Sequence, residues 1–313
     1  MKFMIHAEDL TKSYRGTRVL DRFTLYVAPG TVCGLLGPNG AGKTTALRIL
    51  ATLIQADSGS ARIAGFDLAT ESDRVRSVMG FVGQSPAIDE SLTGRHNLTM
   101  FARLSHLRRA QARNRSEELL AWFGLAAVAD RAASGYSGGM RRRLDLAVGL
   151  ILAPQLLFLD EPTTGLDPRA RSEVWQDIGA LVETGTTVLL TTQYLDEEDH
   201  LAGQISVLED GLILAEGSPR ALKDQVGGDR VEVVVRNGED IGLAAQVMKA
   251  GSRSEPVVIP GLRRVAAAAP DRHRTLEAVM REFARAEIEI DDVALRQPSL
   301  DDVFMSLTGK NGG

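Results

Sequence analysis

The sequence predicts an α/β fold with a largely parallel sheet, followed by a small α+β domain. Strand-like and helical segments alternate along the first part of the chain, and several of the strands are short, apolar runs. Near residue 228 a second group of segments begins with a different order. A chain of 313 residues is long enough for one large domain and a small one.

The expected strands of the large domain are buried apolar runs, at residues 31–36, 156–159, 187–190 and 205–208, with a hairpin partner at 212–215. Helical spacing covers residues 92–133, which we interpret as an all-helical insert between two sheet segments. We therefore place the large domain at residues 1–224, with a helical subdomain at about 85–150.

Gly227-Gly228 marks a linker, and the segments beyond it follow the order βαββαβ. They lie at residues 231–236, 241–250, 257–259, 264–268, 275–286 and 288–295. This order predicts a small ferredoxin-like domain at residues 228–313. A last helix is expected to start at Ser299, with Asp302 at the capping-box position of its first turn.

The composition narrows the class of partner. A net charge of −5 argues against general electrostatic binding to nucleic acid. We interpret the basic runs at Arg108–Arg109 and Arg141–Arg143 as solvated helix faces. The longest charge-free apolar stretch, residues 146–159, is interrupted and falls short of the roughly 20 residues of a membrane span. Any membrane association is therefore expected to come through a partner.

Residues 37–44 read GPNGAGKT, the spacing G-x-x-x-x-G-K-[ST] of a phosphate-binding loop. The glycines allow close backbone approach to phosphate oxygens, and the following helix directs its N-terminal dipole at the same anion. Lys43 supplies a positive charge for the β- and γ-phosphates, and the Thr44 hydroxyl suits a Mg²⁺ ligand. The expected ATP-binding residues of this loop are Gly37, Pro38, Asn39, Gly40, Ala41, Gly42, Lys43, Thr44 and Thr45.

Two carboxylates follow the buried strand at residues 156–159. Asp160 is expected at the mouth of the sheet, where α/β proteins place their ligands, and it can hold Mg²⁺ directly or through water. Glu161 can orient or deprotonate an attacking water. We therefore predict hydrolysis of the nucleotide, with Glu161 and Lys43 as catalytic residues.

The segment YSGGM at residues 136–140 opens a run with helical spacing. Ser137 can cap that helix, while Gly138 and Gly139 expose backbone N–H groups to an anion. Together with the phosphate loop and LLFLDEPTTGLDP from Leu156, this segment resembles the signature of ATP-binding-cassette (ABC) ATPases, in content and in order. The resemblance covers residues 1 to about 220 and implies a P-loop ABC ATPase domain with a mixed sheet core and a helical signature subdomain.

The same resemblance implies a head-to-tail homodimer that holds ATP and Mg²⁺ between one subunit's phosphate loop and the other's signature. Tyr14 corresponds to the aromatic residue that stacks on adenine, Gln84 to the Q-loop glutamine that reaches Mg²⁺, and Asp167 to the D-loop aspartate. The chain departs from the family pattern in having YSGGM for LSGGQ, and His96 where many relatives have an acid. It also has Gln193 where the switch histidine usually stands, and we expect Gln193 to take part in catalysis through its amide.

The chain resembles the daunorubicin-resistance-type branch of bacterial ABC ATPases in three segments, TTQYLDEED, YSGGMRRRLD and QPSLDDVFMSLTG. This branch implies a peripheral ATPase subunit at the cytoplasmic face of the cell membrane, with a separate transmembrane permease and no nucleic-acid partner. The permease would export drugs, antibiotics or complex lipids. One alternative is a soluble ABC ATPase that acts on ribosomes or DNA. Another is a nucleotide sensor without turnover, against which the intact Lys43, Asp160 and Glu161 argue.

Overall fold

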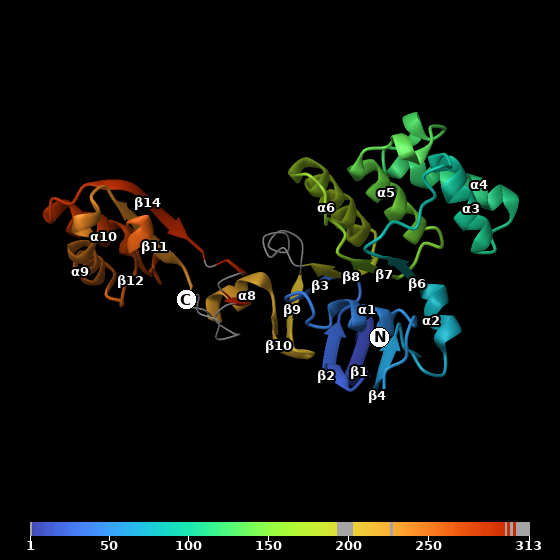
Figure 1. Ribbon diagram of the computed structural model, residues 1–313, viewed down its shortest axis with the longest axis horizontal. Coiled ribbons are helices and arrows are strands. Elements are labelled where there is room, and N and C mark those ends of the chain that lie inside the picture. The colour runs from blue at the N-terminus through green and yellow to red at the C-terminus, as the bar shows by residue number, and fades with distance from the viewer. Residues whose placement is uncertain (1, 193–202, 226–227, 298, 301–302, 305–313) are drawn as a thin grey trace. The chain divides into compact units, whose positions relative to one another are not determined.

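The computed structural model describes residues 2–192, 203–225, 228–297, 299–300 and 303–304. The described chain divides into two compact units, Met1–Ser218 and Pro219–Gly313 (Figure 1). The second unit therefore starts a few residues before the domain boundary expected at 224–228, because helix α8 (Pro219–Gln225) groups with it.

A four-stranded antiparallel sheet begins the large unit. Its strands are β1 (Ile5–Tyr14), β2 (Thr17–Val27), β4 (Ser58–Ile63) and β5 (Phe66–Asp67). They lie in the order β2-β1-β4-β5, and every neighbouring pair is antiparallel. None of these four strands was expected from the sequence.

A six-stranded sheet forms the centre of the large unit. Its strands, in spatial order, are β10 (Leu212–Gly217), β9 (Gln204–Glu209), β3 (Val32–Leu36), β8 (Thr187–Thr192), β7 (Leu156–Asp160) and β6 (Met79–Val82). All neighbours are parallel except β10, which pairs antiparallel with β9. The predicted mixed, largely parallel sheet is confirmed, and its parallel strands end at a common edge.

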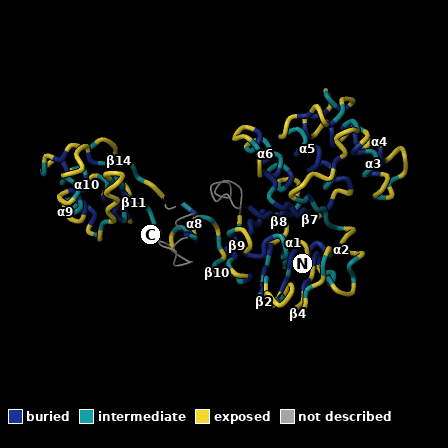
Figure 2. The backbone as a smooth tube through the Cα atoms, in the orientation of Figure 1, coloured by how far each residue is buried: buried dark blue, intermediate teal, exposed yellow. Residues whose placement is uncertain are grey.

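Helix α1 (Lys43–Leu50) lies between the two sheets, and one hydrophobic core joins it to both. Its residues Ala46, Leu47, Ile49 and Leu50 are all fully buried. Each large side chain among them contributes roughly 1.5–3 kcal/mol by burial. Strands β7 and β8 are buried along their whole length, as Figure 2 shows in dark blue.

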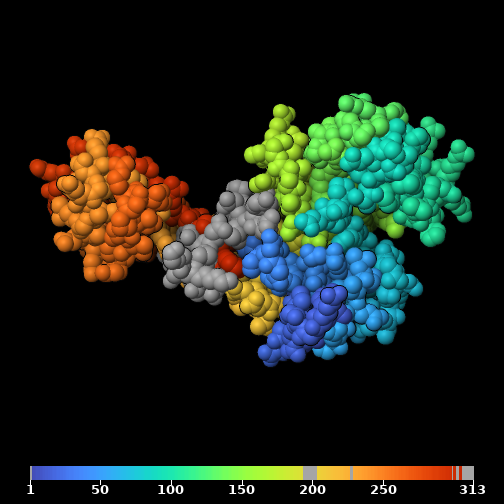
Figure 3. Space-filling view, viewed as in Figure 1, coloured from blue at the N-terminus to red at the C-terminus, as the bar shows by residue number. Residues whose placement is uncertain are grey.

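The opposite face of the central sheet carries α5 (Gly138–Gly149) and α6 (Pro168–Glu183) (Figure 1). Helices α3 (Gly94–Leu104) and α4 (Arg109–Trp122) complete the expected helical subdomain, while α2 (Ser72–Val78) lies before β6. In the space-filling view this subdomain is the cyan-to-green part of the large unit (Figure 3). No helix in the described part of the chain is long and apolar enough to span a membrane.

The small unit has the expected βαββαβ order. After α8 come β11 (Arg230–Val235), α9 (Ile241–Ser252), β12 (Val257–Ile259), β13 (Arg264–Ala268), α10 (Arg272–Arg285) and β14 (Ile290–Arg296). The strands form an antiparallel sheet in the order β12-β13-β11-β14. Alternate residues of β11 are buried, and they belong to the same hydrophobic core as side chains of α9 and α10. The small unit therefore has a core of its own. Asp302 lies outside the described residues.

Candidate active site

The phosphate loop, residues 37–44, connects β3 to α1. Gly42 at the N-cap of α1 has φ of 108°, a conformation that favours glycine. A Cβ atom there would also lie 2.7 Å from the carbonyl oxygen of Val19. The ammonium group of Lys43 donates hydrogen bonds to the carbonyl oxygens of Gly37 at 2.6 Å and Pro38 at 3.0 Å. The loop thus wraps around its own lysine, which is only 5% exposed.

A cavity of about 160 Å³ opens beside this loop, lined by Val19, Asn39, Gly40, Gly42, Lys43, Thr44, Thr45 and Glu161. Small-molecule pockets usually start at roughly 300 Å³, so the space suits a phosphate chain rather than a whole nucleotide. Glu161 is far from the phosphate loop in the sequence, yet it lines the same cavity as Lys43 and Thr44. The cavity therefore unites the predicted phosphate-binding and catalytic residues.

Asp160 is the last residue of β7 and is 3% exposed. Its Oδ1 accepts a hydrogen bond from Thr44 Oγ1 at 3.2 Å and another from Thr191 Oγ1 at 2.6 Å. Thr191 belongs to the neighbouring strand β8, so the carboxylate is oriented from both sides. The contact places the two predicted magnesium ligands, Thr44 and Asp160, next to each other.

Glu161 has φ of 48°, which is uncommon for a residue other than glycine and costs about 1 kcal/mol. Its backbone N–H donates to Thr191, to the carbonyl oxygen at 3.1 Å and to Oγ1 at 3.0 Å, which holds this conformation. Its Oε2 accepts from Gln84 Nε2 at 3.1 Å and from Thr164 Oγ1 at 3.1 Å. The structure therefore joins the predicted Q-loop glutamine to the predicted base. The contributions of Thr164 and Thr191 were not expected from the sequence.

The signature residues lie at the start of α5. Ser137 is the N-cap, and its Oγ accepts from the backbone N–H of Met140 at 3.2 Å. Asp167 caps α6 in the same way, with Oδ1 accepting from Ala170 N–H at 2.9 Å. Ser137, Gly138 and Asp167 are all exposed. Among the described residues, the lining of the phosphate-loop cavity includes none of the three.

Two further predicted residues flank the site. Tyr14 at the end of β1 is 45% exposed, so its ring is open to a planar ligand, and Lys12 Nζ lies 5.7 Å from the ring centroid. It lies in the β1–β2 hairpin, opposite Thr17. Gln193 follows β8 directly and lies outside the described residues.

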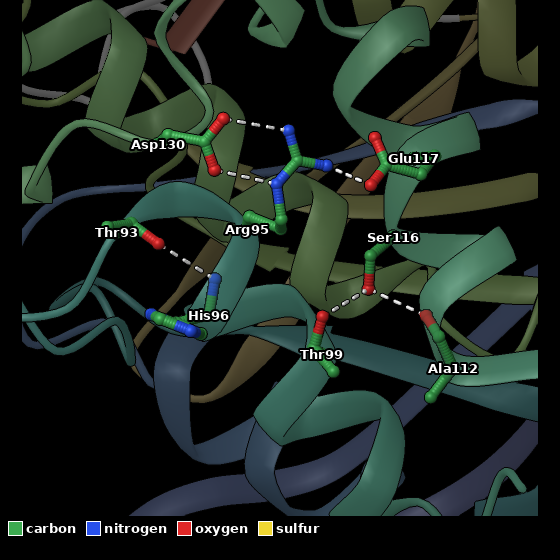
Figure 4. A network of polar contacts seen from close by, with 8 residues as sticks. All are labelled: Thr93, Arg95, His96, Thr99, Ala112, Ser116, Glu117 and Asp130. Carbon is green, nitrogen blue, oxygen red and sulfur yellow. Dashed lines mark hydrogen bonds and ion pairs between the residues drawn. The ribbon is translucent and has the colours of Figure 1, made fainter. Parts of the chain in front are cut away.

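The helical subdomain is fixed by a polar network around the start of α3 (Figure 4). The Arg95 guanidinium donates to both carboxylate oxygens of Asp130, at 2.8 and 3.1 Å, and also pairs with Glu117. These bonds hold the pKa of the exposed Asp130 carboxyl below its ordinary value. The ring of His96 points away from this network, and His96 is exposed.

The interpretation of Arg141–Arg143 as a solvated helix face is wrong for Arg142 and Arg143. Arg142 is 6% exposed and donates to backbone carbonyls on both sides of the site and to Asp145. Arg143 forms ion pairs with Glu173 and Asp177 of α6. Successive residues of a helix point about 100° apart, so three consecutive arginines span about 200°, and on α5 the middle one, Arg142, falls on the buried face. By contrast, Arg108 and Arg109 are exposed, as expected.

Comparison with known proteins identifies the family. Residues 20–164 match the family model described as "ABC transporter". The chain is 52% identical over 307 residues to the daunorubicin resistance ATP-binding protein DrrA2 of Streptomyces coeruleorubidus, covering 98% of this chain and 95% of the relative. It is 36% identical to the Nod factor export ATP-binding protein I of Paraburkholderia xenovorans, covering 98% and 97% respectively.

Solved structures of ATP-binding cassettes have the same fold as the large unit. An ATP-binding subunit of an ABC transporter superposes with a TM-score of 0.63 at 27% identity, covering 72% of this chain and 93% of the other. A dimeric ATP-binding cassette bound to ADP and Pi gives a TM-score of 0.62 at 25% identity, covering 69% and 98%. The chain belongs to the ABC transporter family, as an ATP-binding subunit of the daunorubicin/doxorubicin-resistance type.

Proposed function

We propose that this chain hydrolyses ATP to power the export of drugs, antibiotics or complex lipids through a separate membrane permease. The main support is that Lys43, Thr44 and Glu161 line one cavity at the edge of the sheet where the parallel strands end. Asp160 is hydrogen-bonded to Thr44 beside it. The relatives are named for daunorubicin resistance and Nod factor export, which supports an export role.

The donor set at Thr44 and Asp160 fits Mg²⁺. A hydroxyl and a carboxylate oxygen approach each other at 3.2 Å, and both are hard oxygen ligands of the kind that this ion takes. Gln84 would join them as a third ligand; its amide N–H₂ donates to Glu161, the residue after Asp160, which leaves its amide oxygen for the ion. When bound, Mg²⁺ would neutralise charge on the β- and γ-phosphates.

The protein's own residues supply the rest of the reaction. Lys43 would leave the carbonyls of Gly37 and Pro38 to contact the phosphates, because a phosphate is a stronger acceptor than a neutral carbonyl. Glu161 would take the proton of the attacking water while Gln84 and Thr164 orient its carboxylate. In this mechanism Gln193 would donate its amide N–H₂ to the γ-phosphate.

The exposed signature supports a composite site in a homodimer. Ser137, Gly138 and Asp167 lie on the surface, outside the lining of their own chain's phosphate-loop cavity. Together with Gly139 they would close the site of a second copy, and Tyr14 would stack on the adenine of its own chain's nucleotide. The subunit would then work at the cytoplasmic face of the cell membrane, attached through the permease.

Fractionation tests this proposal against the alternative of action on ribosomes or DNA. A tagged full-length chain is expressed in its natural host and captured from detergent-solubilised membranes and from ribosomes. We expect it to recover a multi-span membrane protein, with Mg²⁺-dependent ATPase activity in the membrane eluate. Recovery with ribosomal particles and not with a membrane protein would contradict the exporter.

A further inference from the structure

Arg142 is a buried cation whose guanidinium contacts both the segment that carries Gln84 and the segment that carries Glu161. Its Nε donates to the carbonyl oxygen of Pro162 at 2.7 Å, and its Nη2 lies 3.4 Å from the carbonyl oxygen of Asp160. Its Nη1 donates to the carbonyl oxygen of Gly83 at 2.9 Å. The planar fork of an arginine places these donors in a fixed geometry, which makes it suited to holding several acceptors at once.

Asp145, one helical turn further along α5, completes the arrangement. One carboxylate oxygen accepts from Arg142 Nη1 at 3.2 Å, and the other accepts from the backbone N–H of Ala87 at 2.9 Å. The two side chains are 7% and 3% exposed. The Arg142–Asp145 pair therefore holds the backbone at Gly83 and Ala87, on either side of Gln84.

Arg142 also holds the backbone on either side of Glu161, because Asp160 and Pro162 supply the other two carbonyls. Gln84 and Glu161 are themselves hydrogen-bonded at 3.1 Å. Two segments that are 77 residues apart in the sequence are thus tied to one helix.

A buried ion pair contributes little net stability, because desolvation offsets most of the attraction between the charges. Burial lowers the pKa of Arg142 and raises that of Asp145, so each charge is disfavoured by its surroundings. An apolar pair could fill this space with similar stability, but it could not bind three carbonyls and an N–H group. The polar pair therefore contributes these hydrogen bonds to the backbone rather than net stability.

We propose that Arg142 and Asp145, on the helix that Ser137 caps, are positioning residues for hydrolysis. They hold the backbone around Gln84 and Glu161 so that these two side chains are correctly placed relative to each other. This inference rests on the proposed ATPase function. It concerns the geometry of the catalytic carboxylate rather than the binding of nucleotide, which Lys43 and the phosphate loop carry.

Arg142→Lys tests the proposal, with Arg143→Lys as its matched control. Lysine keeps the charge, but one ammonium group cannot reach all of these acceptors. Arg143 is the next residue of the same helix, and it is ion-paired to Asp177 at 2.9 Å, away from the Q-loop. In the full-length chain we expect Arg142→Lys to lower kcat about 10-fold or more with KM changed less than about 3-fold, and Arg143→Lys to leave kcat within about 2-fold.

A double-mutant cycle with Gln84→Ala shows how Arg142 acts. If it acts by positioning Gln84 against Glu161, the double variant loses little more kcat than Gln84→Ala alone. Losses that multiply would show that Arg142 acts independently of Gln84 and would overturn the claim that it positions Gln84 against Glu161.

Hydrogen exchange gives a readout that does not need turnover. We expect Arg142→Lys and the isosteric Asp145→Asn each to speed exchange at the N–H groups of both Ala87 and Glu161, although neither side chain bonds to the N–H of Glu161. Asp145→Asn stands in if Arg142→Lys does not fold. Faster exchange over the whole of α5, or at Ala87 alone, would indicate a merely structural role.

The two proposals fail differently. A wild-type chain that does not hydrolyse ATP, even with its membrane partner, would end the proposed function, while the exchange data would still decide whether the pair couples the two segments. A wild-type chain that hydrolyses ATP, with Arg142→Lys indistinguishable from Arg143→Lys, would overturn only this inference.

Discussion

Thr44 Oγ1 is hydrogen-bonded to Asp160 Oδ1 at 3.2 Å, although 116 positions separate the two residues in the sequence. The contact exists because β3 and β7 both pair with β8 in parallel, which brings the ends of the two strands to one edge of the sheet. A hydroxyl at the start of α1 and a carboxylate at the end of β7 thereby form one oxygen cluster, in the place where a parallel sheet exposes its ligand site.

Removing the Thr44 hydroxyl should affect only the magnesium-bound nucleotide. We expect Thr44→Ala to weaken MgATP binding by about 10- to 100-fold, because the ion loses an oxygen ligand, while ATP in EDTA binds within about 3-fold of wild type. Equilibrium titration with and without Mg²⁺ measures both. Equal losses under the two conditions would mean that the hydroxyl serves only the packing of Asp160.

The composite site can be tested by mixing subunits. Ser137→Arg places a bulky charge at the exposed N-cap of α5, so it should block the site of the partner rather than its own. Lys43→Ala should disable its own chain's site. Each variant alone should be inactive as a homodimer, and an equal mixture should recover part of the activity, since mixed dimers keep one intact site. Full activity of Ser137→Arg alone would rule out a shared site.

Gln193 lies outside the described residues, and the prediction for it rests on the resemblance to the family. Gln193→Ala should slow turnover by about 10- to 100-fold, in line with losing one polar contact worth ~1.5–3 kcal/mol. Gln193→His should keep activity and add a pH dependence between roughly pH 6 and 7, because imidazole titrates there and an amide does not. The measurement is a pH–rate profile of the three proteins at saturating MgATP. An unchanged profile for the alanine variant would assign the γ-phosphate contact to another residue.

The small unit should be dispensable for nucleotide binding, because every phosphate-contacting residue predicted here lies in Met1–Ser218. A chain that ends at Gln225 keeps α8, whose Leu222 is fully buried, and we expect it to bind ATP within about 3-fold of the full chain. Thermal unfolding and ATP titration of the same preparation check this. A truncated chain that folds without binding ATP would show that the small unit completes the site.

The parts predicted from the sequence are those with a local signature. The phosphate loop has fixed spacing, and the apolar run at residues 156–159 marks the buried strand β7, so both could be identified without the structure. The β1 and β2 strands of the antiparallel sheet carry many polar residues, and no such run marks them. Arg142 could not be found either, because its backbone partners come from two distant segments, around Gly83 and around Pro162, and composition alone cannot separate a buried arginine from a solvated one.

The proposed hydrolysis depends on the carboxylate of Glu161, and the substitution Glu161→Gln removes that carboxylate. The amide fills the same space but cannot accept the proton of the attacking water, so ATP binding should persist while hydrolysis stops. Glu183→Gln, near the end of α6, is a control for the loss of one acid in the same unit.

The measurement is phosphate release at saturating MgATP, with size-exclusion chromatography of the same samples. We expect a loss of about 100-fold or more in Glu161→Gln, accumulation of an ATP-bound dimer, and no change in Glu183→Gln. Phosphate release by Glu161→Gln at the rate of the wild type would show that Glu161 is not the base.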